Sequence, residues 1–176
     1  MSSLITDFDQ PTFSVAGSRL HVAVGGSGPP VLLLHGFPET HSTWREVAPE
    51  LADRFSVVCP DLPGYGDSEP PAGGPDSYAK RVTATTMVEL MRRLGHPRFA
   101  VVGHDRGALV AFRAALDHPM TITHLGVLDV IPTLDMWESL HGPAGVFAFH
   151  LYLLAQPSPF PEDTIAADPD QFFGHF

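Results

Sequence analysis

The stretch Val101-Val102-Gly103-His104-Asp105-Arg106-Gly107-Ala108 decides how the rest of this chain is interpreted. It joins an apolar run to a Gly-x-Asp-x-Gly turn, and an apolar pattern with helical spacing follows. These features frame a nucleophile elbow, a sharp strand-to-helix turn that lifts one reactive side chain above a sheet. Serine usually occupies the central position, whereas this chain has Asp105 there. The alternative interpretation is an ordinary strand–helix turn with Asp105 as the N-cap.

Three backbone features are expected around Asp105. Gly103 and Gly107 should let the strand and the helix approach closely while Asp105 adopts strained dihedral angles. The N-terminus of the following helix should stabilise the Asp105 carboxylate. The backbone N–H groups of Arg106 and of Phe37, which lies in an earlier loop, are expected to form an oxyanion hole.

Apolar strands and amphipathic helices alternate on both sides of this turn. Predicted strands cover residues 12–16, 19–24, 31–34, 55–59, 99–102 and 122–128. Predicted helices run from Ser42 or Thr43 to about Ala52, from 77 to 94 and from 106 to 117. We expect the first helix to bury Trp44, Val47 and Leu51, and the second to bury Val82, Met87, Leu90 and Leu94. The alternation predicts an α/β fold with a mostly parallel sheet and helices on both faces.

The pattern changes near Pro132. Residues 134–154 are rich in leucine and aromatic residues without a strand–turn rhythm, which indicates helices, and residues 162–176 are expected to start another helix. We therefore predict the N-terminal part of an α/β core over residues 1–132 and a partial helical cap over residues 133–176.

Composition excludes several classes of protein. The chain has 176 residues, 44% of them hydrophobic, which is enough for a sizeable core. Its net charge of −10 argues against nucleic acid and anionic membranes as partners. No segment is typical of a signal peptide or a membrane span, so a cytoplasmic location is expected. Cys59 is the single cysteine, so no internal disulfide can form and no metal site is expected.

Two further motifs accompany the elbow, namely Leu32-Leu33-Leu34-His35-Gly36-Phe37-Pro38 and Pro60-Asp61-Leu62-Pro63-Gly64-Tyr65-Gly66-Asp67-Ser68. With them, the chain from about residue 20 to residue 160 resembles the α/β-hydrolase superfamily, in its branch with an aspartate nucleophile. That branch contains haloalkane and haloacetate dehalogenases and soluble epoxide hydrolases. The elbow, Ala115-Leu116-Asp117-His118-Pro119 and Val127-Leu128-Asp129-Val130-Ile131-Pro132-Thr133 look most like fluoroacetate (haloacetate) dehalogenases. The resemblance implies a small-molecule substrate and no cofactor.

An aspartate at the elbow suits attack on saturated carbon. A serine that attacked an alkyl carbon would leave an ether, which water does not readily cleave, whereas a carboxylate leaves an ester that water can hydrolyse. Asp105 therefore favours a carbon–halogen bond or an epoxide over an ordinary ester or amide substrate. The oxyanion hole would then serve the second step.

The resemblance makes Asp129 the acid that orients a catalytic histidine, and a turn carboxylate is the alternative role. In this family the histidine follows two further strands near the C-terminus. The sequence ends at Phe176, on the order of a hundred residues short of a complete domain of this type, so we expect the last strands and that histidine to be missing. His175 is not expected to replace it, and His35 and His104 are expected to be structural.

The cap region separates the two branches. His150 lies seven residues before Pro157, where epoxide hydrolases have a tyrosine that protonates the epoxide oxygen. Haloacetate dehalogenases have a histidine there, which helps to hold the leaving halide. Tyr152 is the alternative donor, and a packed helix histidine is the alternative role for His150.

Two positions depart from the haloacetate dehalogenase pattern. Leu151 replaces a tryptophan that donates to the halide. Arg106 matches the first of two arginines that clamp the substrate carboxylate, but Leu109 stands at the second position. The loss of half of a charged clamp leaves room for a larger or neutral substrate. Arg113, one turn deeper, is not expected to substitute.

These observations predict hydrolytic dehalogenation of a haloacid or alkyl halide through an alkyl-ester intermediate. We expect the 176-residue chain to alkylate Asp105 at most once, without turnover. An epoxide hydrolase and a non-catalytic truncated homologue are the alternatives. An unpaired apolar strand at residues 122–128 is expected to cause self-association.

Overall fold

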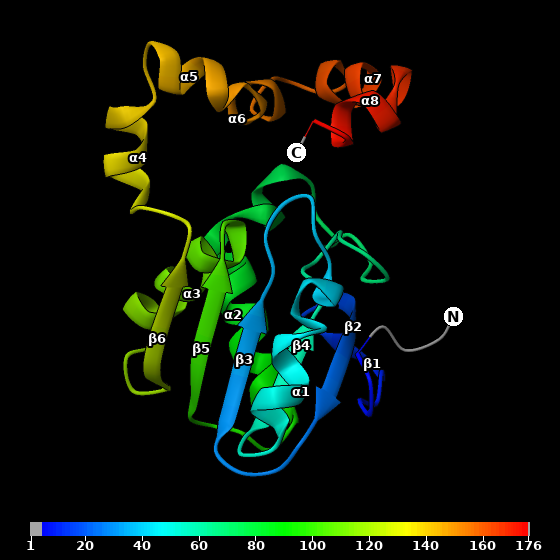
Figure 1. Cartoon of the computed structure of the whole chain (residues 1–176), viewed down its shortest axis with the longest axis vertical. Coiled ribbons are helices and arrows are strands. Elements are labelled where there is room, and N and C mark those ends of the chain that lie inside the picture. The colour runs from blue at the N-terminus through cyan, green and yellow to red at the C-terminus, as the bar shows by residue number, and fades with distance from the viewer. Residues whose placement is uncertain (1–4, 176) are drawn as a thin grey trace. The chain divides into compact units, whose positions relative to one another are not determined.

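The computed structural model of the chain describes residues 5–175, and their contacts form two units, one ending at Val130 and the other starting at Ile131. The first unit is built on a six-stranded sheet in the order β1-β2-β4-β3-β5-β6 (Figure 1). Its strands are β1 (Thr12–Val15), β2 (Ser18–Gly25), β3 (Pro30–Leu34), β4 (Ser56–Pro60), β5 (Phe99–His104) and β6 (Ile122–Leu128). Its helices are the 3-10 turns η1 (His41–Trp44) and η2 (Pro75–Tyr78) and the α-helices α1 (Val47–Ala52), α2 (Lys80–Arg93) and α3 (Arg106–Asp117).

The sheet is mixed but mostly parallel, which confirms the predicted fold class. Strands β4, β3, β5 and β6 are parallel neighbours, whereas β2 joins β1 and β4 in antiparallel pairs. Because parallel strands point their carboxyl ends to the same edge, the loops after β3, β5 and β6 meet there. The register Leu34↔Gly103 and His104↔Leu128 brings these three strand ends level.

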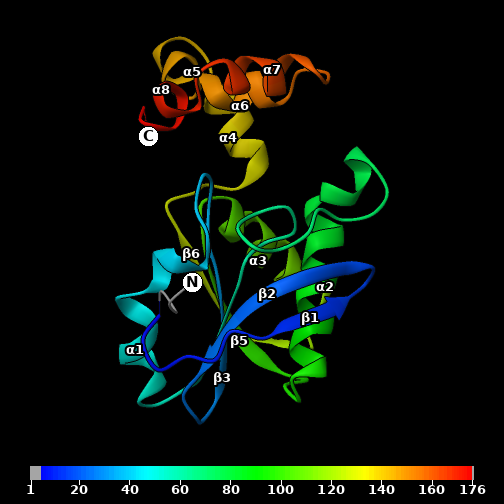
Figure 2. The ribbon, with the colours of Figure 1, turned by 90° about the vertical axis from the view of Figure 1, so that its right-hand side faces the viewer.

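Helices cover both faces of the sheet, with α1 on one face and α2 and α3 on the other (Figure 2). Alternate residues of β3 reach opposite layers, as the two-residue period of a strand requires. Leu32 and Leu34 pack in the core that includes residues of α2 and α3, whereas Leu33 packs in the core that includes Trp44 and Ala48. All three leucines are at most 1% exposed, so the apolar run of β3 reflects burial on both faces.

Two predicted helices start later than the sequence pattern indicates. The chain forms η1 and then α1 instead of one helix from Ser42 or Thr43, and the Thr40 hydroxyl caps η1 by accepting from the Ser42 N–H at 3.3 Å. This break places Val47 outward, 45% exposed, and Ala48 inward. The prediction that Val47 is buried was therefore wrong.

The second late start concerns α2, which begins at Lys80 after η2. Ala79 has a ψ of 137°, which interrupts the helix that was expected to start at residue 77. Val82 lies five residues before the buried Met87, about 140° around the helix from it, and is 44% exposed. The prediction that Val82 is buried was wrong for this reason, whereas Met87 and Leu90 are in the core.

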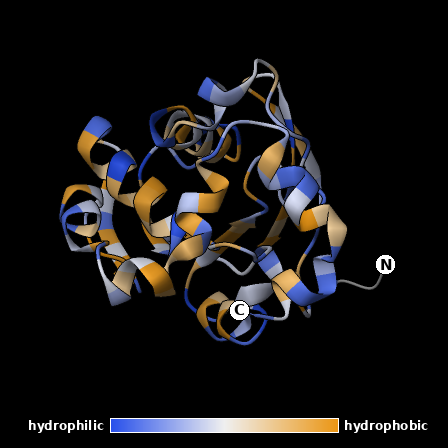
Figure 3. Ribbon diagram, turned by 90° about the horizontal axis from the view of Figure 1, so that it is seen from above, coloured by the Kyte–Doolittle hydropathy of each residue, from blue (hydrophilic) through white to orange (hydrophobic). Residues whose placement is uncertain are grey.

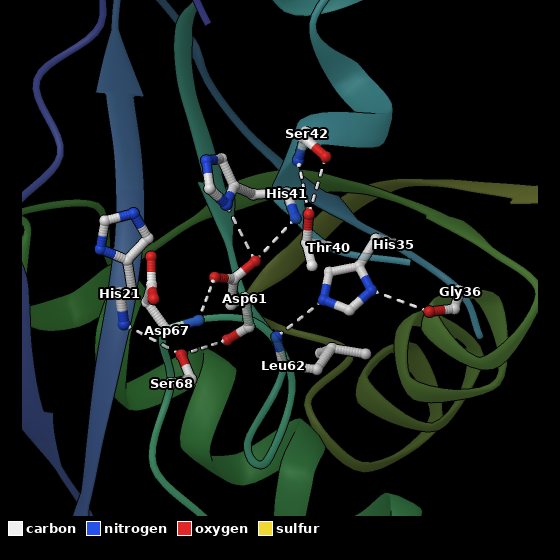
Figure 4. A network of polar contacts seen from close by, with 10 residues as sticks. All are labelled: His21, His35, Gly36, Thr40, His41, Ser42, Asp61, Leu62, Asp67 and Ser68. Carbon is white, nitrogen blue, oxygen red and sulfur yellow. Dashed lines mark hydrogen bonds and ion pairs between the residues drawn. The ribbon is translucent and has the colours of Figure 1, made fainter. Parts of the chain in front are cut away.

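A buried imidazole fastens the loop after β3 to the loop after β4 (Figure 4). The His35 Nδ1–H donates to the Gly36 carbonyl at 2.8 Å, and Nε2 accepts from the Leu62 N–H at 2.9 Å. An acceptor role for Nε2 requires the neutral ring. Burial lowers the pKa of His35 below its ordinary value, which keeps the ring in that form. The expectation that His35 is structural agrees with these contacts.

Asp61 organises the second of these loops (Figure 4). Its Oδ1 accepts from the His41 N–H at 2.7 Å and from the His41 ring at 2.9 Å, and its Oδ2 accepts from the Asp67 N–H at 3.0 Å. Burial raises the pKa of Asp61, but these hydrogen bonds outweigh burial and leave the pKa below its ordinary value. Gly66 has a φ of 52°, and any Cβ there would collide with the Asp61 carboxylate.

The second unit consists of short helices: α4 (Thr133–Ser139), α5 (Pro143–Phe147), α6 (Phe149–Leu154), α7 (Phe160–Ala167) and α8 (Pro169–Phe173). Aromatic rings provide packing inside it, such as Trp137 against Tyr152 at 5.8 Å and Phe149 against Phe172 at 6.3 Å between centroids. Hydrophobic and hydrophilic residues lie side by side along the helices (Figure 3). Among residues 5–175, no helix is both long enough and apolar enough to cross a membrane.

The His35 contacts predict a pH-dependent stability. The unfolded chain takes up the His35 proton near pH 6.5, whereas the folded state resists it, so the free energy of unfolding should fall as the pH drops below about 6.5. Asp61 does not interfere in this range, because its pKa lies below the ordinary carboxyl value and its protonation changes the free energy of unfolding only at lower pH. In urea unfolding between about pH 7.5 and 5.5, His35→Asn should flatten this dependence. The exposed His124 provides the control, because His124→Asn should retain the wild-type slope; parallel curves for His35→Asn and wild type would refute the assignment.

A second prediction concerns β6, which pairs with β5 on one side and with no strand among the described residues on the other. It exposes Leu125, Val127 and Leu128 to 39%, 41% and 45%. An apolar edge strand is a template for pairing with another chain. We expect concentration-dependent self-association in analytical ultracentrifugation and a shift toward monomer in Val127→Lys. Val47→Lys, an equally exposed change on α1, should not shift it, and a wild-type monomer at all concentrations would contradict the prediction.

Candidate active site

Asp105 lies in the turn between β5 and α3 and has a strained backbone, with φ 45° and ψ −115°. Its N–H donates to the carbonyl of Leu128 at the end of β6, at 3.1 Å. Positive φ is costly for a residue with a side chain and persists only where the surrounding structure imposes it. The turn therefore has the geometry expected of an elbow.

Close packing of backbone imposes this conformation. A Cβ on Gly103 would collide with the Gly107 carbonyl, and a Cβ on Gly107 would collide with the carbonyls of Leu34 and His35. A Cβ on Gly36 would lie 2.7 Å from the Cβ of Asp105. Three chain segments thus approach each other without intervening side chains, and Asp105 is held at their meeting point.

One backbone N–H group holds the Asp105 carboxylate. The Phe37 N–H donates to Asp105 Oδ2 at 2.8 Å, and Oδ1 accepts no hydrogen bond from the residues that the structure describes. Arg106 opens α3, so its N–H is one of the first-turn donors that have no carbonyl partner within the helix. One carboxylate oxygen is therefore held by a backbone donor, and the other has no hydrogen-bond donor among the described residues.

A second acidic residue, Glu39, lies next to the elbow and was not predicted. Its Oε2 accepts from the Gly36 N–H at 2.8 Å and lies 3.0 Å from His104 Nδ1, and its Oε1 accepts from the Thr43 hydroxyl at 3.0 Å. Burial raises the pKa of Glu39, but these hydrogen bonds outweigh it and leave the pKa below its ordinary value. The only sequence signal was its position directly after the His-Gly-Phe-Pro loop.

Asp129 follows β6 and lies on the other side of the His104 ring. Its Oδ2 is 3.8 Å from His104 Nε2, and its side chain is 89% exposed. The backbone φ of 54° is again strained for a residue with a side chain. The structure thus brings Asp129 to the same sheet edge as Asp105, with His104 between Asp129 and Glu39.

Arg106 extends away from its backbone toward a small pocket. Its guanidinium lies over the Phe37 ring at 4.9 Å from the centroid. The pocket is lined by Leu62, Pro63, Tyr65, Tyr78, Lys80, Thr83, Arg106 and Val110. Burial raises the pKa of the Tyr65 hydroxyl, and the nearby Arg106 opposes this increase. Arg113 takes no part, because it forms a two-point ion pair with Asp117.

The predicted cap residues belong to the second unit and are described within it. The Tyr152 hydroxyl donates to the Leu140 carbonyl, and the ring packs edge-on against Trp137. His150 is half-buried, with its ring 6.0 Å from the Phe149 ring. His175 also packs against Phe149, at 5.5 Å between ring centroids. The roles of His150 and Tyr152 stay predictions.

One further cluster has residue types that bind metals. Ligand atoms of His21, His41 and Asp61 lie within 4.8 Å of one another. Both Asp61 oxygens already accept hydrogen bonds from the chain, and one of them engages the His41 ring. The cluster is therefore explained as the loop network of Figure 4, and no ion is assigned to it.

Comparison with known proteins places this geometry in a family. The family described as the alpha/beta hydrolase fold matches residues 29–147. A fluoroacetate dehalogenase from a Burkholderia species is 48% identical over 168 residues, covering 94% of this chain and 55% of the relative. A soluble epoxide hydrolase from Corynebacterium sp. strain C12 is 37% identical over 163 residues, covering 92% of this chain and 56% of the relative.

A solved structure from Pseudomonas aeruginosa, assigned provisionally as an epoxide hydrolase, superposes with a TM-score of 0.94 at 46% identity, covering 99% of this chain and 59% of that one. The chain spans little more than half the length of these two curated relatives. The geometry of the elbow, the strand order of the sheet and these similarities all indicate the same fold family. The chain belongs to the alpha/beta hydrolase fold family, and its named relatives are hydrolases.

Proposed function

We propose that Asp105 is the nucleophile of a hydrolytic dehalogenation. The observation that carries the proposal is the carboxylate at the elbow, with Oδ2 held by the Phe37 N–H and Oδ1 without a hydrogen-bond partner among the described residues. Oδ1 attacks the saturated carbon that bears the halogen. The new O–C bond forms as the carbon–halogen bond breaks, and the halide leaves with the bonding electrons. The product is an alkyl ester on Asp105.

The same donors suit the second step. Water adds to the ester carbonyl carbon of Asp105, and the negative charge develops on Oδ2, which the Phe37 N–H already contacts. The Arg106 N–H is the proposed second donor. This step needs a base to take the proton from water, and the proposed orienting acid for such a base is Asp129.

The base itself is not assigned to any described histidine near the elbow. Both His35 ring nitrogens are engaged by Gly36 and Leu62, and the His104 ring lies between Glu39 and Asp129. We therefore propose that this chain performs the alkylation step and stops at the ester. The alternative of a non-catalytic homologue would predict no ester at all.

Haloacid or alkyl halide is the preferred substrate class, because Arg106 follows the nucleophile as in the dehalogenase pattern and the fluoroacetate dehalogenase is 48% identical. In this proposal Arg106 contacts the substrate and His150 helps to hold the leaving halide. Epoxide opening is the second candidate, since several relatives are named epoxide hydrolases and Tyr152 offers a hydroxyl. The cytoplasmic location likewise stays a prediction.

Incubation with bromoacetate tests the proposal. Intact-mass and peptide-mapping mass spectrometry should show a single carboxymethyl ester on Asp105, and halide release should stop at about one equivalent per chain. Asp105→Asn should form no such ester. Cys59 is fully buried, and burial raises the pKa of its thiol, so it should not compete in the folded chain.

Three other results would count against parts of this proposal. Absence of an ester on Asp105 with bromoacetate and with an alkyl bromide would refute the dehalogenase proposal, and an adduct formed only with a terminal epoxide would favour the second candidate. Halide release that continues far beyond one equivalent would refute the assignment of a single turnover.

A further inference from the structure

Two cationic side chains line one pocket beside the elbow. Lys80 is the first residue of α2 and Arg106 is the first residue of α3, and both line the pocket together with the hydroxyl-bearing rings of Tyr65 and Tyr78. Lys80 and Arg106 are both half-buried. Sequence reasoning did not single out Lys80, since it lies 25 residues before the elbow and matches no motif of the chemistry.

Neither cation forms a direct ion pair with a carboxylate of the described residues. Among residues 5–175, no carboxylate lies within ion-pair distance of Lys80 or Arg106. Their neighbours on the same helices differ, because Arg81 and Arg113 both pair with Asp117. Two like charges that are partly withdrawn from water are unfavourable unless an anion joins them.

The electrostatic environment supports this description. Burial lowers the pKa of Lys80, the nearby Arg106 lowers it further, and the Asp105 carboxylate raises it. Asp105 is thus close enough for its charge to act on Lys80. With one carboxylate near two cations, the site retains one positive charge for a ligand.

We propose that Lys80 and Arg106 together form a binding site for the carboxylate of the substrate, so that the substrate is a haloacid rather than a neutral alkyl halide. The inference rests on the proposed reaction at Asp105 and narrows its substrate class. Lys80, on α2, supplies the second positive charge of the clamp, which haloacetate dehalogenases have at the position of Leu109 on α3. Tyr65 lines the same pocket and offers a hydroxyl that can add a hydrogen bond.

The chemistry of the site fits one carboxylate. Arg106 offers a planar set of donors, and Lys80 offers a compact charge that can adjust to the ligand. The remaining wall, formed by Leu62, Pro63 and Val110, is apolar and suits the alkyl part of a short acid. A neutral substrate would leave the remaining positive charge of the site without a counter-charge.

The test compares bromoacetate with bromoacetamide, which have the same reactive carbon and leaving group but differ in charge. The rate of ester formation on Asp105 is measured for each reagent by peptide-mapping mass spectrometry and divided by the rate of that reagent with free acetate. The wild-type chain should prefer the acid. Lys80→Met should reduce this preference roughly tenfold, the effect of losing one charged hydrogen bond.

Matched variants separate charge from structure. Lys80→Arg should retain the preference, and adding Leu109→Arg to Lys80→Met should restore it. Arg81→Met, one residue away but facing Asp117, should behave as wild type. Circular dichroism establishes that each variant is folded, and Lys80→Gln replaces Lys80→Met if the latter is not.

The outcomes distinguish the two proposals. Equal corrected rates for acid and amide, or an unchanged preference in folded Lys80→Met, would overturn the carboxylate site and leave the role of Asp105 intact. If neither reagent esterifies Asp105, the proposed reaction fails. An NMR titration with acetate then decides the site on its own: shifts of the Tyr65 ring signals that disappear in Lys80→Met support it, and no shift overturns it.

Discussion

The structure depends on one close approach of backbone. The loop after β3, the end of β5 and the start of α3 meet with glycines at Gly36, Gly103 and Gly107, and no side chain fits between them. This contact holds Asp105 at a φ of 45° and places the Phe37 N–H on its carboxylate. The strain at Asp105 is thus maintained by the packing of a whole sheet edge, and the geometry of the elbow follows from the fold rather than from the Asp105 turn alone.

A second layer of contacts supports this approach. His35 joins the loop after β3 to the loop after β4, and Glu39 accepts from Gly36 in the turn that carries Phe37. Both groups are buried or half-buried and both keep one protonation state near neutral pH, because burial lowers the pKa of His35 and hydrogen bonds lower that of Glu39. The loop that carries Phe37, the proposed oxyanion-hole donor, is therefore fixed by polar contacts on both sides.

Much of the fold could be predicted because its signals are local. Apolar runs identified the strands. The bounds of α3 and β6 agree with the predicted ranges 106–117 and 122–128. The starts of α1 and α2 could not be predicted, since each helix is preceded by a 3-10 turn that the apolar pattern does not distinguish from α-helix. At the site, the elbow followed from its motif, but Glu39 and Lys80 did not, because only the packing of distant segments brings them to Asp105. Their roles depend on proximity in space, which spacing along the chain does not encode.

The hydrogen bond from Phe37 to Asp105 has a consequence for folding. It joins residues 68 positions apart and lies across the junction of β3 and β5, so it can form only after the central strands have paired in their native register. A collapsed or partly folded chain would contain Asp105 without its partner and would have an ordinary aspartate there. The reactivity proposed for this carboxylate would therefore depend on native topology, and it should appear late in refolding, after the bulk of the helix and strand signal has been recovered.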